Sequence, residues 1–574
     1  MQPIARVTAV LLAAICSATG FAQTVIRVDS AANDPNPTGQ SWSLAYPTLS
    51  EALALAANNP QNSYDIWVAA GTYYPIDPNP ATRSNTFGLD DNIRIFGGFL
   101  GNATGGGETA LTQRNPEINR TILSGDLDQD DDANADGVPD NFPFGTTFSD
   151  NVYHVVTIED YDENDGVENT KLSGVVIRGG YADGTGSDES DGAGILVLLP
   201  GNGGPLLNRL VLEYNFAQGN PDNEMFPPYA GGGGICIKGV GLASLSNCEF
   251  RRNYVKVGFG GGLLAIKASG PSCQLQNCLF VHNTVDRGSG GGASAEGHEF
   301  VNLTFYGNQL LQEVDGWDPA TAFYRQNPGV PGNPSLTSLQ NSIIWGNPPP
   351  TGESWYQMEG AAAIHCDIED GHFWQPSGQT QSYNNISLDP LFRDPAAGNF
   401  RLTYYDVTES CDVTSPCIDA ADDTLLLDDE TNVDDNTGTT SPVPWDFKKG
   451  PRIVDFDDDS GQLSTDMGVY EECFADVNGD GSVGLADLTE LLSCYGSTCA
   501  GSCCNANIAS CNSAVDISDL TVLLSRYGES CVESEGFALQ SGDDPLTDWL
   551  QSAAAVDVLE WWNQGMPPIG DDTR

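Results

Sequence analysis

A short pattern, an apolar residue followed three positions later by asparagine, recurs through the middle of the chain. The copies are Leu212-Glu-Tyr-Asn215, Phe250-Arg-Arg-Asn253, Phe280-Val-His-Asn283, Phe305-Tyr-Gly-Asn308 and Ile344-Trp-Gly-Asn347. Glycine-rich segments at 232–235, 260–264 and 290–293 lie between them. A repeat of about 25 to 40 residues built from short β-type runs is typical of a solenoid, in which each repeat forms one coil.

The repeat predicts which side chains lie inside the solenoid. Leu245, Phe250, Leu275 and Phe280 occupy matching positions of two consecutive repeats, so we expect them to stack inward. The repeated asparagines would form an internal ladder at a turn, in which each amide bonds its neighbour. About three short strands are expected in each coil, with glycines at the bends.

These motifs resemble a right-handed parallel β-helix of the pectin-lyase type, and also the repeats of chlamydial polymorphic outer-membrane proteins. The segments 42–53, 65–73, 122–128 and 153–156 look like the N-terminal cap of bacterial surface β-helix proteins of the choice-of-anchor kind. The segments 389–392, 398–402, 415–419 and 466–471 look like their C-terminal closing region. The resemblance covers residues 23–472. It implies the fold, and it is weak evidence for any activity.

Solenoid ends need caps, because they expose sheet edges. Residues 50–58 predict a capping helix with Ser50 as its N-cap. The segments 126–141, 216–230, 312–335 and 348–360 break the repeat and are predicted to be loops on one face.

A calcium-binding loop is predicted at residues 476–487. Oxygen ligands fall at its positions 1, 3, 5 and 12, the position-7 ligand is a backbone carbonyl, and Gly481 allows the sharp turn at position 6. These five ligand residues are Asp476, Asn478, Asp480, Ser482 and Asp487.

The calcium loop and the helix after it have a second copy. Asp487-Leu-Thr-Glu-Leu-Leu-Ser-Cys-Tyr-Gly496 is matched by Asp519-Leu-Thr-Val-Leu-Leu-Ser-Arg-Tyr-Gly528. The pair resembles a type I dockerin over residues 473–531, which implies a small α-helical, EF-hand-like module, bound Ca²⁺ and a cohesin-like or other surface protein as partner. The second loop is one residue longer and lacks an Asp-Gly turn, so weak or no calcium binding is expected there. Its candidate ligands are Asn507, Ser510 or Asn512, Asp516 and Asp519.

Two further acidic clusters either bind calcium or form solvated patches. In the first, the spacing of Asp126, Asp128 and Asp130 and the Asp136-Gly137 turn favour a calcium site. The second cluster, at 455–459, is interpreted as a solvated patch.

The N-terminal residues predict export. Residues 1–22 have the charged end, short apolar run and small-residue cleavage site of a secretory signal peptide. No later segment is apolar enough for a membrane span. Export permits disulfides, and seven cysteines fall within 473–531, although their pairing cannot be deduced from sequence.

The tail, 532–574, contains an amphipathic helix predicted at 545–563.

Net charge limits the possible partners. A net charge of −56 excludes non-specific nucleic-acid binding, because phosphate contacts need lysine and arginine. Two functions stay open. The first is a secreted, cell-surface or extracellular scaffold that binds carbohydrate or protein and docks through the calcium module. The alternative is a polysaccharide lyase or glycoside hydrolase, whose weak catalytic candidates are Glu296, His298 and Glu299.

Overall fold

The computed structural model divides the chain into two compact units, residues 1–531 and 532–574. Every residue that it describes belongs to the first unit. These residues are 24–60, 62–76, 81–103, 106–132, 138–159, 169–186, 188–199, 201, 203–219, 230–239, 241–266, 273–295, 297–312, 320–325, 337–348, 355–374, 382–404, 414–427, 446–447, 464–479, 482–498, 505–509 and 514–528. The predicted signal peptide, the tail and the cluster at 455–459 lie outside this set.

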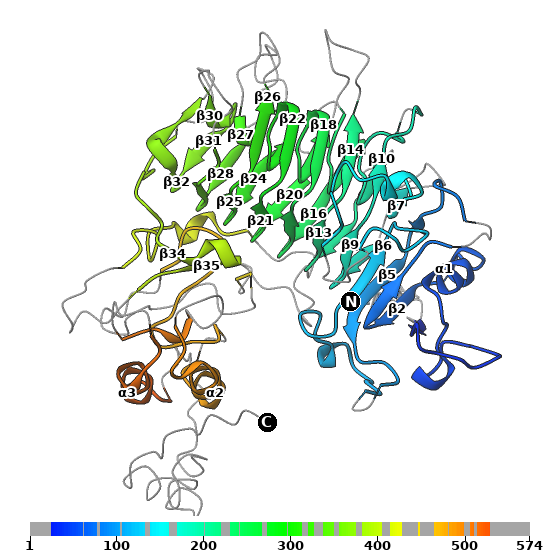
Figure 1. The fold of residues 1–574 in the computed structure, drawn as a ribbon, viewed down its shortest axis with the longest axis horizontal. Helices are drawn as coiled ribbons and strands as arrows, with labels where there is room; N and C mark the ends of the chain where they lie inside the picture. Colours follow the sequence, from blue (N-terminus) through cyan, green and yellow to red (C-terminus); the bar gives the residue numbers. More distant parts are fainter. Residues whose placement is uncertain are drawn as a thin grey trace, which may run out of the picture. The chain divides into compact units, whose positions relative to one another are not determined.

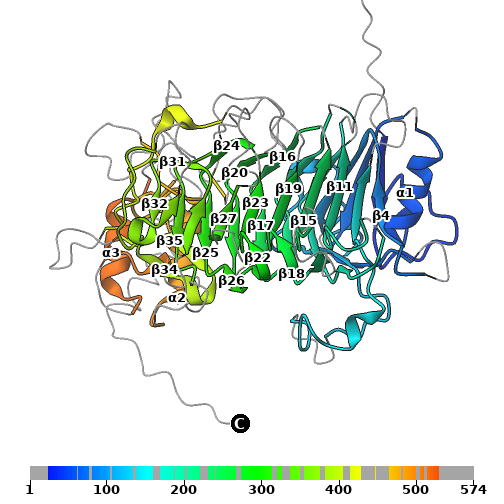
Figure 2. The ribbon, with the colours of Figure 1, turned by 90° about the horizontal axis from the view of Figure 1, so that it is seen from above.

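Residues 24–374 form a parallel β-helix, as predicted (Figures 1 and 2). In a complete coil the chain passes through four strands, for example β16 (Ala243–Ser246), β17 (Glu249–Arg251), β18 (Tyr254–Phe259) and β19 (Leu263–Ile266). Each strand pairs in parallel with its counterpart one coil later. The strands therefore stack into four sheets, which we number in the order in which the chain visits them.

The four sheets contain ten, nine, five and nine strands among the described residues. Besides β16, sheet 1 contains β1 (Thr24–Val28), β2 (Tyr64–Ala69), β5 (Ile93–Phe99), β8 (Lys171–Ser173), β12 (Leu206–Asn208), β20 (Cys273–Gln276), β24 (Gly297–Val301), β28 (Ser338–Gln340) and β31 (Ala362–Ile364). Besides β17, sheet 2 contains β3 (Gly71–Tyr73), β6 (Thr121–Ser124), β9 (Val176–Arg178), β13 (Val211–Glu213), β21 (Leu279–Val281), β25 (Thr304–Tyr306), β29 (Ile343–Trp345) and β32 (Asp367–Ile368).

The other two sheets complete the coils. Besides β18, sheet 3 contains β10 (Tyr181–Ala182), β14 (Phe216–Gly219), β22 (Thr284–Ser289) and β26 (Gln309–Gln312). Besides β19, sheet 4 contains β4 (Phe87–Leu89), β7 (Val156–Glu159), β11 (Ile195–Leu199), β15 (Ile235–Gly239), β23 (Ala293–Ala295), β27 (Ala320–Tyr324), β30 (Tyr356–Glu359) and β33 (Phe373–Trp374).

The predicted core is confirmed. The rings of Phe250, Phe280 and Phe305 are fully buried and stack in parallel, with centroids 4.6 Å and 4.7 Å apart. The asparagine ladder also forms, because each side-chain amide donates to the Oδ1 of the next asparagine at 3.0 Å. Each Oδ1 also accepts the preceding asparagine's backbone N–H, so the ladder satisfies buried polar groups that the strands do not pair.

Three local expectations were wrong. Five coils contain a fourth strand, in sheet 3, which the expectation of about three strands per coil omitted. The predicted loops 216–230, 312–335 and 348–360 contain β14, β27 and β30, because short segments of these insertions pair in parallel with neighbouring coils. The capping helix α1 (Leu49–Ala57) has Thr48 as its N-cap instead of Ser50, since the Thr48 hydroxyl accepts the Glu51 N–H.

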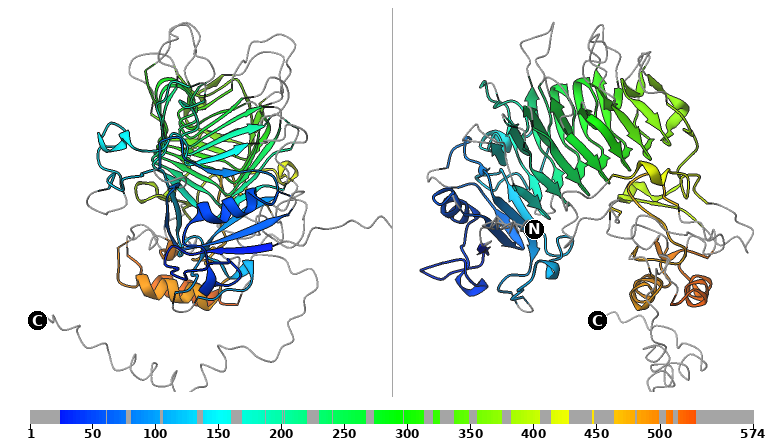
Figure 3. Two further views of the ribbon diagram at one scale, coloured as in Figure 1. Left: turned by 90° about the vertical axis from the view of Figure 1, so that its right-hand side faces the viewer. Right: turned by 180° about the vertical axis from the view of Figure 1, so that it is seen from behind.

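Helix α1 closes the N-terminal end of the β-helix (Figure 3). Its apolar face, Leu49, Ala52, Leu53 and Ala56, joins the core of the first coil. Among the described residues, no helix is long and apolar enough to cross a membrane. In the described part of the chain, short 3-10 helices lie in connections at Trp42–Leu44, Leu111–Gln113, Thr147–Ser149, Glu369–Gly371, Pro395–Ala397 and Asp423–Leu425.

After the last coil the chain returns along sheet 2 as an antiparallel pair, β34 (Phe392–Asp394) and β35 (Asn399–Leu402), which we call the C-terminal hairpin. Phe400 and Tyr470 of the returning chain pack on Leu279 and Val281 of sheet 2. Helices α2 (Leu485–Cys494) and α3 (Ile517–Ser525) then form a small separate core with Val477, Ile508 and Tyr404.

Candidate functional site

The outer face of sheet 2 carries charged residues in register from coil to coil. Because side chains alternate along a strand, the buried Phe250 at the centre of β17 leaves Glu249 and Arg251 facing outward. Glu213 of β13 lies directly beside Arg251 in the parallel register. The parallel stacking therefore brings together charges that are 38 residues apart in the sequence.

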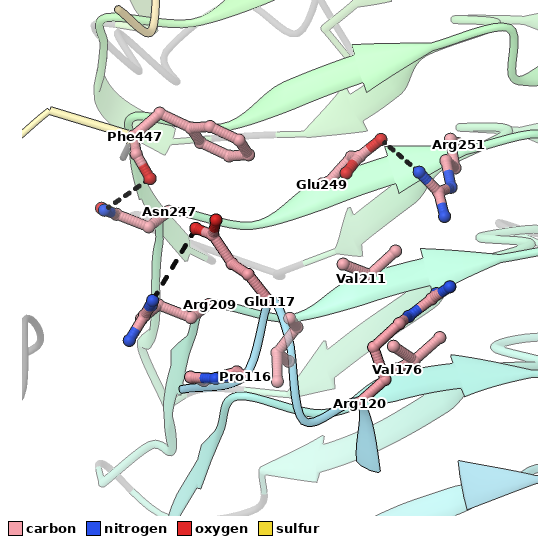
Figure 4. A pocket seen from close by; sticks show the side chains of 11 residues that line it. Pro116, Glu117, Arg120, Val176, Arg209, Val211, Asn247, Glu249, Arg251 and Phe447 are labelled. Atoms are coloured by element: carbon pink, nitrogen blue, oxygen red, sulfur yellow. Dashed lines mark hydrogen bonds and ion pairs between the residues drawn. The ribbon is translucent and has the colours of Figure 1, made fainter. Parts of the chain in front are cut away.

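Arg251 joins the two carboxylates of this face. Its Nε donates to Glu213 Oε2 at 2.8 Å. Its Nη1 donates to Glu249 Oε1 at 3.1 Å, as Figure 4 shows. Arg120, which precedes β6, places Nη2 3.4 Å from the other oxygen of Glu213. Burial lowers the pKa of Arg251, but the two carboxylates outweigh this effect and raise it above its ordinary value.

Three adjoining hollows of about 280, 340 and 540 Å³ open on this face, and Glu249 and Arg251 line all of them. We call them together the sheet-2 groove. The first hollow also contains the ion pair between Arg209 and Glu117, 3.9 Å apart, shown in Figure 4. Other lining residues are Phe447, Tyr214, Arg252, His282, Phe400, Tyr470 and Asn478.

Two groups at the second hollow have distinct electrostatic character. The Arg252 guanidinium lies 5.8 Å from the centre of the Tyr214 ring, in a cation–π contact. Burial lowers the pKa of His282, so its ring is neutral at pH 7. The groove thus offers arginines, carboxylates, a neutral imidazole and aromatic rings within one open surface.

The first calcium loop predicted from the sequence is partly described. Asp476 and Asp487 are buried, with 2% and 0% of their surface exposed. Asp476 Oδ1 accepts the Gly479 N–H at 2.7 Å, and Asp487 accepts the N–H groups of Asn478 and Gly484 at 3.0 Å and 2.7 Å. Ser482 is among the described residues, whereas Asp480 lies outside them. Two buried carboxylates held by backbone donors at one loop fit an oxygen-binding cation such as calcium.

The second loop repeats this construction at its last position. Asp519 is fully buried and accepts the N–H groups of Ile508, Ala509 and Asp516 at 2.7, 2.9 and 2.8 Å. Burial raises its pKa. Asn507 is buried at the start of the loop, whereas Asn512 lies outside the described residues. Calcium binding by either loop stays a prediction.

The acidic loop after β6 brings three carboxylates together. One oxygen each of Asp126, Asp130 and Asp131 lies within 4.8 Å of the others. Asp128 is not in this group, and its backbone N–H donates to Asp150 at 2.8 Å. Burial, reinforced by the charge of Asp126, raises the pKa of Asp131 to about 7.

Little of the catalytic candidates Glu296, His298 and Glu299 lies within the described part of the chain. Glu296 lies outside the described residues, and the backbone of His298 and Glu299 forms part of β24 in sheet 1. The side chains of these two residues are also outside the described set. Their predicted catalytic role stays a prediction.

The sheet-2 groove was not predicted from the sequence. Glu213 and Arg251 both directly follow the apolar residue of the repeat, so aligning the repeats would have placed them side by side on the outer face. Arg120 comes from a connection outside the repeats, and no sequence signal indicates its position.

The described cysteines fall into two groups. In the β-helix, Cys236, Cys248, Cys278 and Cys366 are buried free thiols, as is Cys417 of the returning chain, and Cys273 is also buried. Cys473 and Cys494, at the calcium-loop segment, are disulfide-bonded.

Comparison with solved structures finds proteins of low similarity. Pectate lyase Pel9A is 12% identical, with a TM-score of 0.34, and the match covers 79% of this chain and 98% of the lyase. A glycoside hydrolase is 8% identical, with a TM-score of 0.32 and coverage of 63% and 96%. The pectin methylesterase of Aspergillus niger, in deglycosylated form, is 13% identical, with a TM-score of 0.23 and coverage of 72% and 95%. No protein-family model and no curated relative matches the chain. The assignment as a parallel β-helix rests on the strand pairing.

Proposed function

We propose that this protein is an extracellular β-helix scaffold that binds a polysaccharide in the sheet-2 groove and docks to a partner protein through a calcium-binding, dockerin-like module. The observation that carries the proposal is the Arg251 guanidinium shared between Glu213 and Glu249 in an open groove. Secretion is part of the same proposal and is supported by the signal-like composition of residues 1–22.

The chemistry of the groove suits sugar hydroxyl groups. Arginine has five N–H donors in a planar fork, and the two carboxylates of the groove can hold only some of them. The carboxylates are acceptors for ligand hydroxyls, and Phe447 offers apolar surface to a sugar ring. A mixed set of donors, acceptors and aromatic rings along consecutive coils therefore favours an extended polar chain as the ligand.

The ion pairs made by the two carboxylates favour binding over cleavage. Glu213 and Glu249 are both ion-paired to Arg251, and Glu213 has a second arginine, Arg120, at 3.4 Å. A hydrolase needs one carboxyl group that can give up a proton to the leaving group. The polysaccharide lyase or glycoside hydrolase is the alternative, and product formation would distinguish it.

The docking part of the proposal rests on the exposed faces of α2 and α3. Leu485 and Leu492 of α2 are 65% and 51% exposed, and Ile517 and Leu524 of α3 are 49% and 48% exposed. The two pairs occupy equivalent positions in the two copies of the loop-plus-helix repeat. Exposed apolar residues grouped on one small module are typical of a protein-binding surface. A cohesin-like domain is the proposed partner.

The groove is tested by binding measurements on the purified full chain against a panel of neutral and anionic polysaccharides. Arg252→Ala removes an exposed cation that lines the second hollow, and we expect it to weaken binding at least about tenfold, as loss of one charged hydrogen bond does. Lys256→Ala is the matched control, because Lys256 is an exposed cation four residues away that does not line the groove.

The outcomes separate the two functions. Binding that is reduced by Arg252→Ala alone supports the scaffold. Release of reducing ends or unsaturated products from any polysaccharide would overturn it in favour of the enzyme. Equal effects of Arg252→Ala and Lys256→Ala would count against the sheet-2 groove as the binding surface.

A further inference from the structure

We infer that the loop after β6 forms a calcium site with Asp126, Asp130 and Asp131 as carboxylate ligands and Asn151 as a neutral ligand. The site is distinct from the loops of the dockerin-like module. This inference does not depend on whether the protein binds a polysaccharide.

The first argument is the approach of three carboxylates. Their ligand oxygens lie within 4.8 Å of one another, in a protein with a net charge of −56. The Asp126 carboxylate is fixed in place because Oδ1 accepts the Asp130 N–H and Oδ2 accepts the Asp131 N–H, both at 3.2 Å. Without a cation, like charges at this separation repel one another.

The second argument is independent of the acidic cluster as such. Asn151 is completely buried, and its amide is directed at the cluster, since Nδ2 donates to Asp131 Oδ2 at 2.7 Å. The other atom of that amide, Oδ1, is buried without a hydrogen-bond partner among the described residues. Asp131 is only 4% exposed, and its Oδ1 is also buried without a hydrogen-bond partner among the described residues. A buried oxygen that accepts no hydrogen bond is costly, and a cation satisfies it.

The donor set indicates the class of ion. The ligand atoms identified at this place are all oxygens, from three carboxylates and one amide. Hard divalent cations take oxygen ligands, and calcium accepts irregular sets of six to eight of them. The described residues supply part of such a shell, and water completes it.

The site would fasten both ends of one segment. Asp126–Asp131 lies at its start and Asn151 at its end. Between them, three phenylalanines pack on two tyrosines of sheet 3 and on Tyr214, which directly follows β13 of sheet 2. These ring pairs are Phe142–Tyr214, Phe144–Tyr254 and Phe148–Tyr181, with centroids 5.4 to 5.7 Å apart. Val138 of the same segment lines the second hollow of the sheet-2 groove. Calcium at this site would therefore fix one wall of the groove.

The test compares two neighbouring aspartates in the full chain. The protein is stripped with a chelator, and bound calcium is counted by equilibrium dialysis and calorimetry with CaCl₂. Asp130→Asn should lose one equivalent, whereas Asp128→Asn should bind as much calcium as the unmodified chain. Both residues are exposed, so neither change disturbs packing.

A third variant separates this site from the dockerin-like module. Asp476→Asn alters the module, and combined with Asp130→Asn it should lose one equivalent more than either single change. The inference is overturned if Asp130→Asn retains every equivalent, or if Asp128→Asn loses the same equivalent. Failure of polysaccharide binding with a normal calcium count would affect only the proposed function.

Discussion

Arg401 of the C-terminal hairpin donates hydrogen bonds to both carboxylate oxygens of Glu472. Its Nε lies 3.1 Å from Oε1 and its Nη2 lies 2.8 Å from Oε2. The same guanidinium donates to the backbone carbonyls of Asp476 and Val477 at 3.2 Å and 2.8 Å. The loop predicted to bind calcium is therefore attached to the C-terminal hairpin through buried ion pairs, since Arg393 Nη2 also lies 3.2 Å from Glu472 Oε2.

Arg401→Ala is expected to lower the free energy of unfolding by about 3 kcal/mol, because the fully buried Glu472 loses one of its two arginine partners while Arg393 remains. Arg94→Ala is the matched control. Arg94 forms the same bidentate ion pair with Asp65, at 2.7 and 2.9 Å, but the Arg94 side chain is 37% exposed. The control should cost no more than about 1 kcal/mol. Urea unfolding of both variants measures the difference, and equal losses would contradict this account.

Phe280→Ala should cost about 3–5 kcal/mol, because it removes the middle ring of the buried stack between Phe250 and Phe305. Leu311→Ala, at a residue 44% exposed, should change stability by less than about 0.5 kcal/mol. Each coil contacts only its neighbours, so amide exchange in Phe280→Ala should rise first in β17, β21 and β25. Uniform loss of protection along the β-helix would contradict a local effect.

The parts of the fold that repeat were predictable from the sequence, and the parts that do not repeat were not. Phe280 and Asn283 recur at matching positions, so their stacking followed from the repeat alone. Arg120 and Asn151 come from connections, and their neighbours are set by how each connection folds back on the sheets. The cation site shows the same limit. Asp126 and Asp130 were visible as a cluster, but Asn151 joins it from 20 residues beyond Asp131.

Calcium binding by the dockerin-like module is expected to reside mainly in the first loop. Asp480→Ala deletes a charged ligand at the turn of that loop, so the full chain should lose one tight site in calorimetry. Asn512→Ala should have little effect, because the longer second loop lacks the Asp-Gly turn. Thermal unfolding gives a second readout, since calcium should raise the Tm of the Asn512→Ala variant more than that of Asp480→Ala. Two module sites of equal strength would contradict the prediction.

The exposed faces of α2 and α3 should bind a cohesin-like domain. Leu492→Asp combined with Leu524→Asp introduces charge at equivalent positions of the two helices, and we expect binding to a panel of purified cohesin domains to fall at least about a hundredfold. Leu311→Asp, an equally exposed leucine on β26, is the control and should leave binding unchanged. If no cohesin in the panel binds the unmodified chain in calcium, the proposed partner is wrong.

Asp367 should make stability fall as pH rises. Burial, reinforced by the charges of Asp389 and Glu369, raises its pKa to about 6 from an ordinary value of 3.8. Between these two values the folded protein holds a proton that the unfolded chain releases. The stabilising contribution of this group is therefore complete below about pH 4, and it is lost as the pH rises to about 6. The difference is at most about 3 kcal/mol.

Asp367→Asn removes this titration while keeping one oxygen to accept the Leu388 N–H, which Asp367 Oδ1 accepts at 3.1 Å. We expect the variant to be more stable than the unmodified chain at pH 7, and the difference to shrink toward pH 4. Asp422→Asn is a useful comparison, because its hydrogen bonds to Thr424 lower the pKa of Asp422, so the sign is reversed and the variant should lose stability at pH 7. Urea unfolding at pH 4, 5, 6 and 7 measures both. A pH profile of Asp367→Asn parallel to that of the unmodified chain would show that Asp367 is ionised in the folded protein throughout this range.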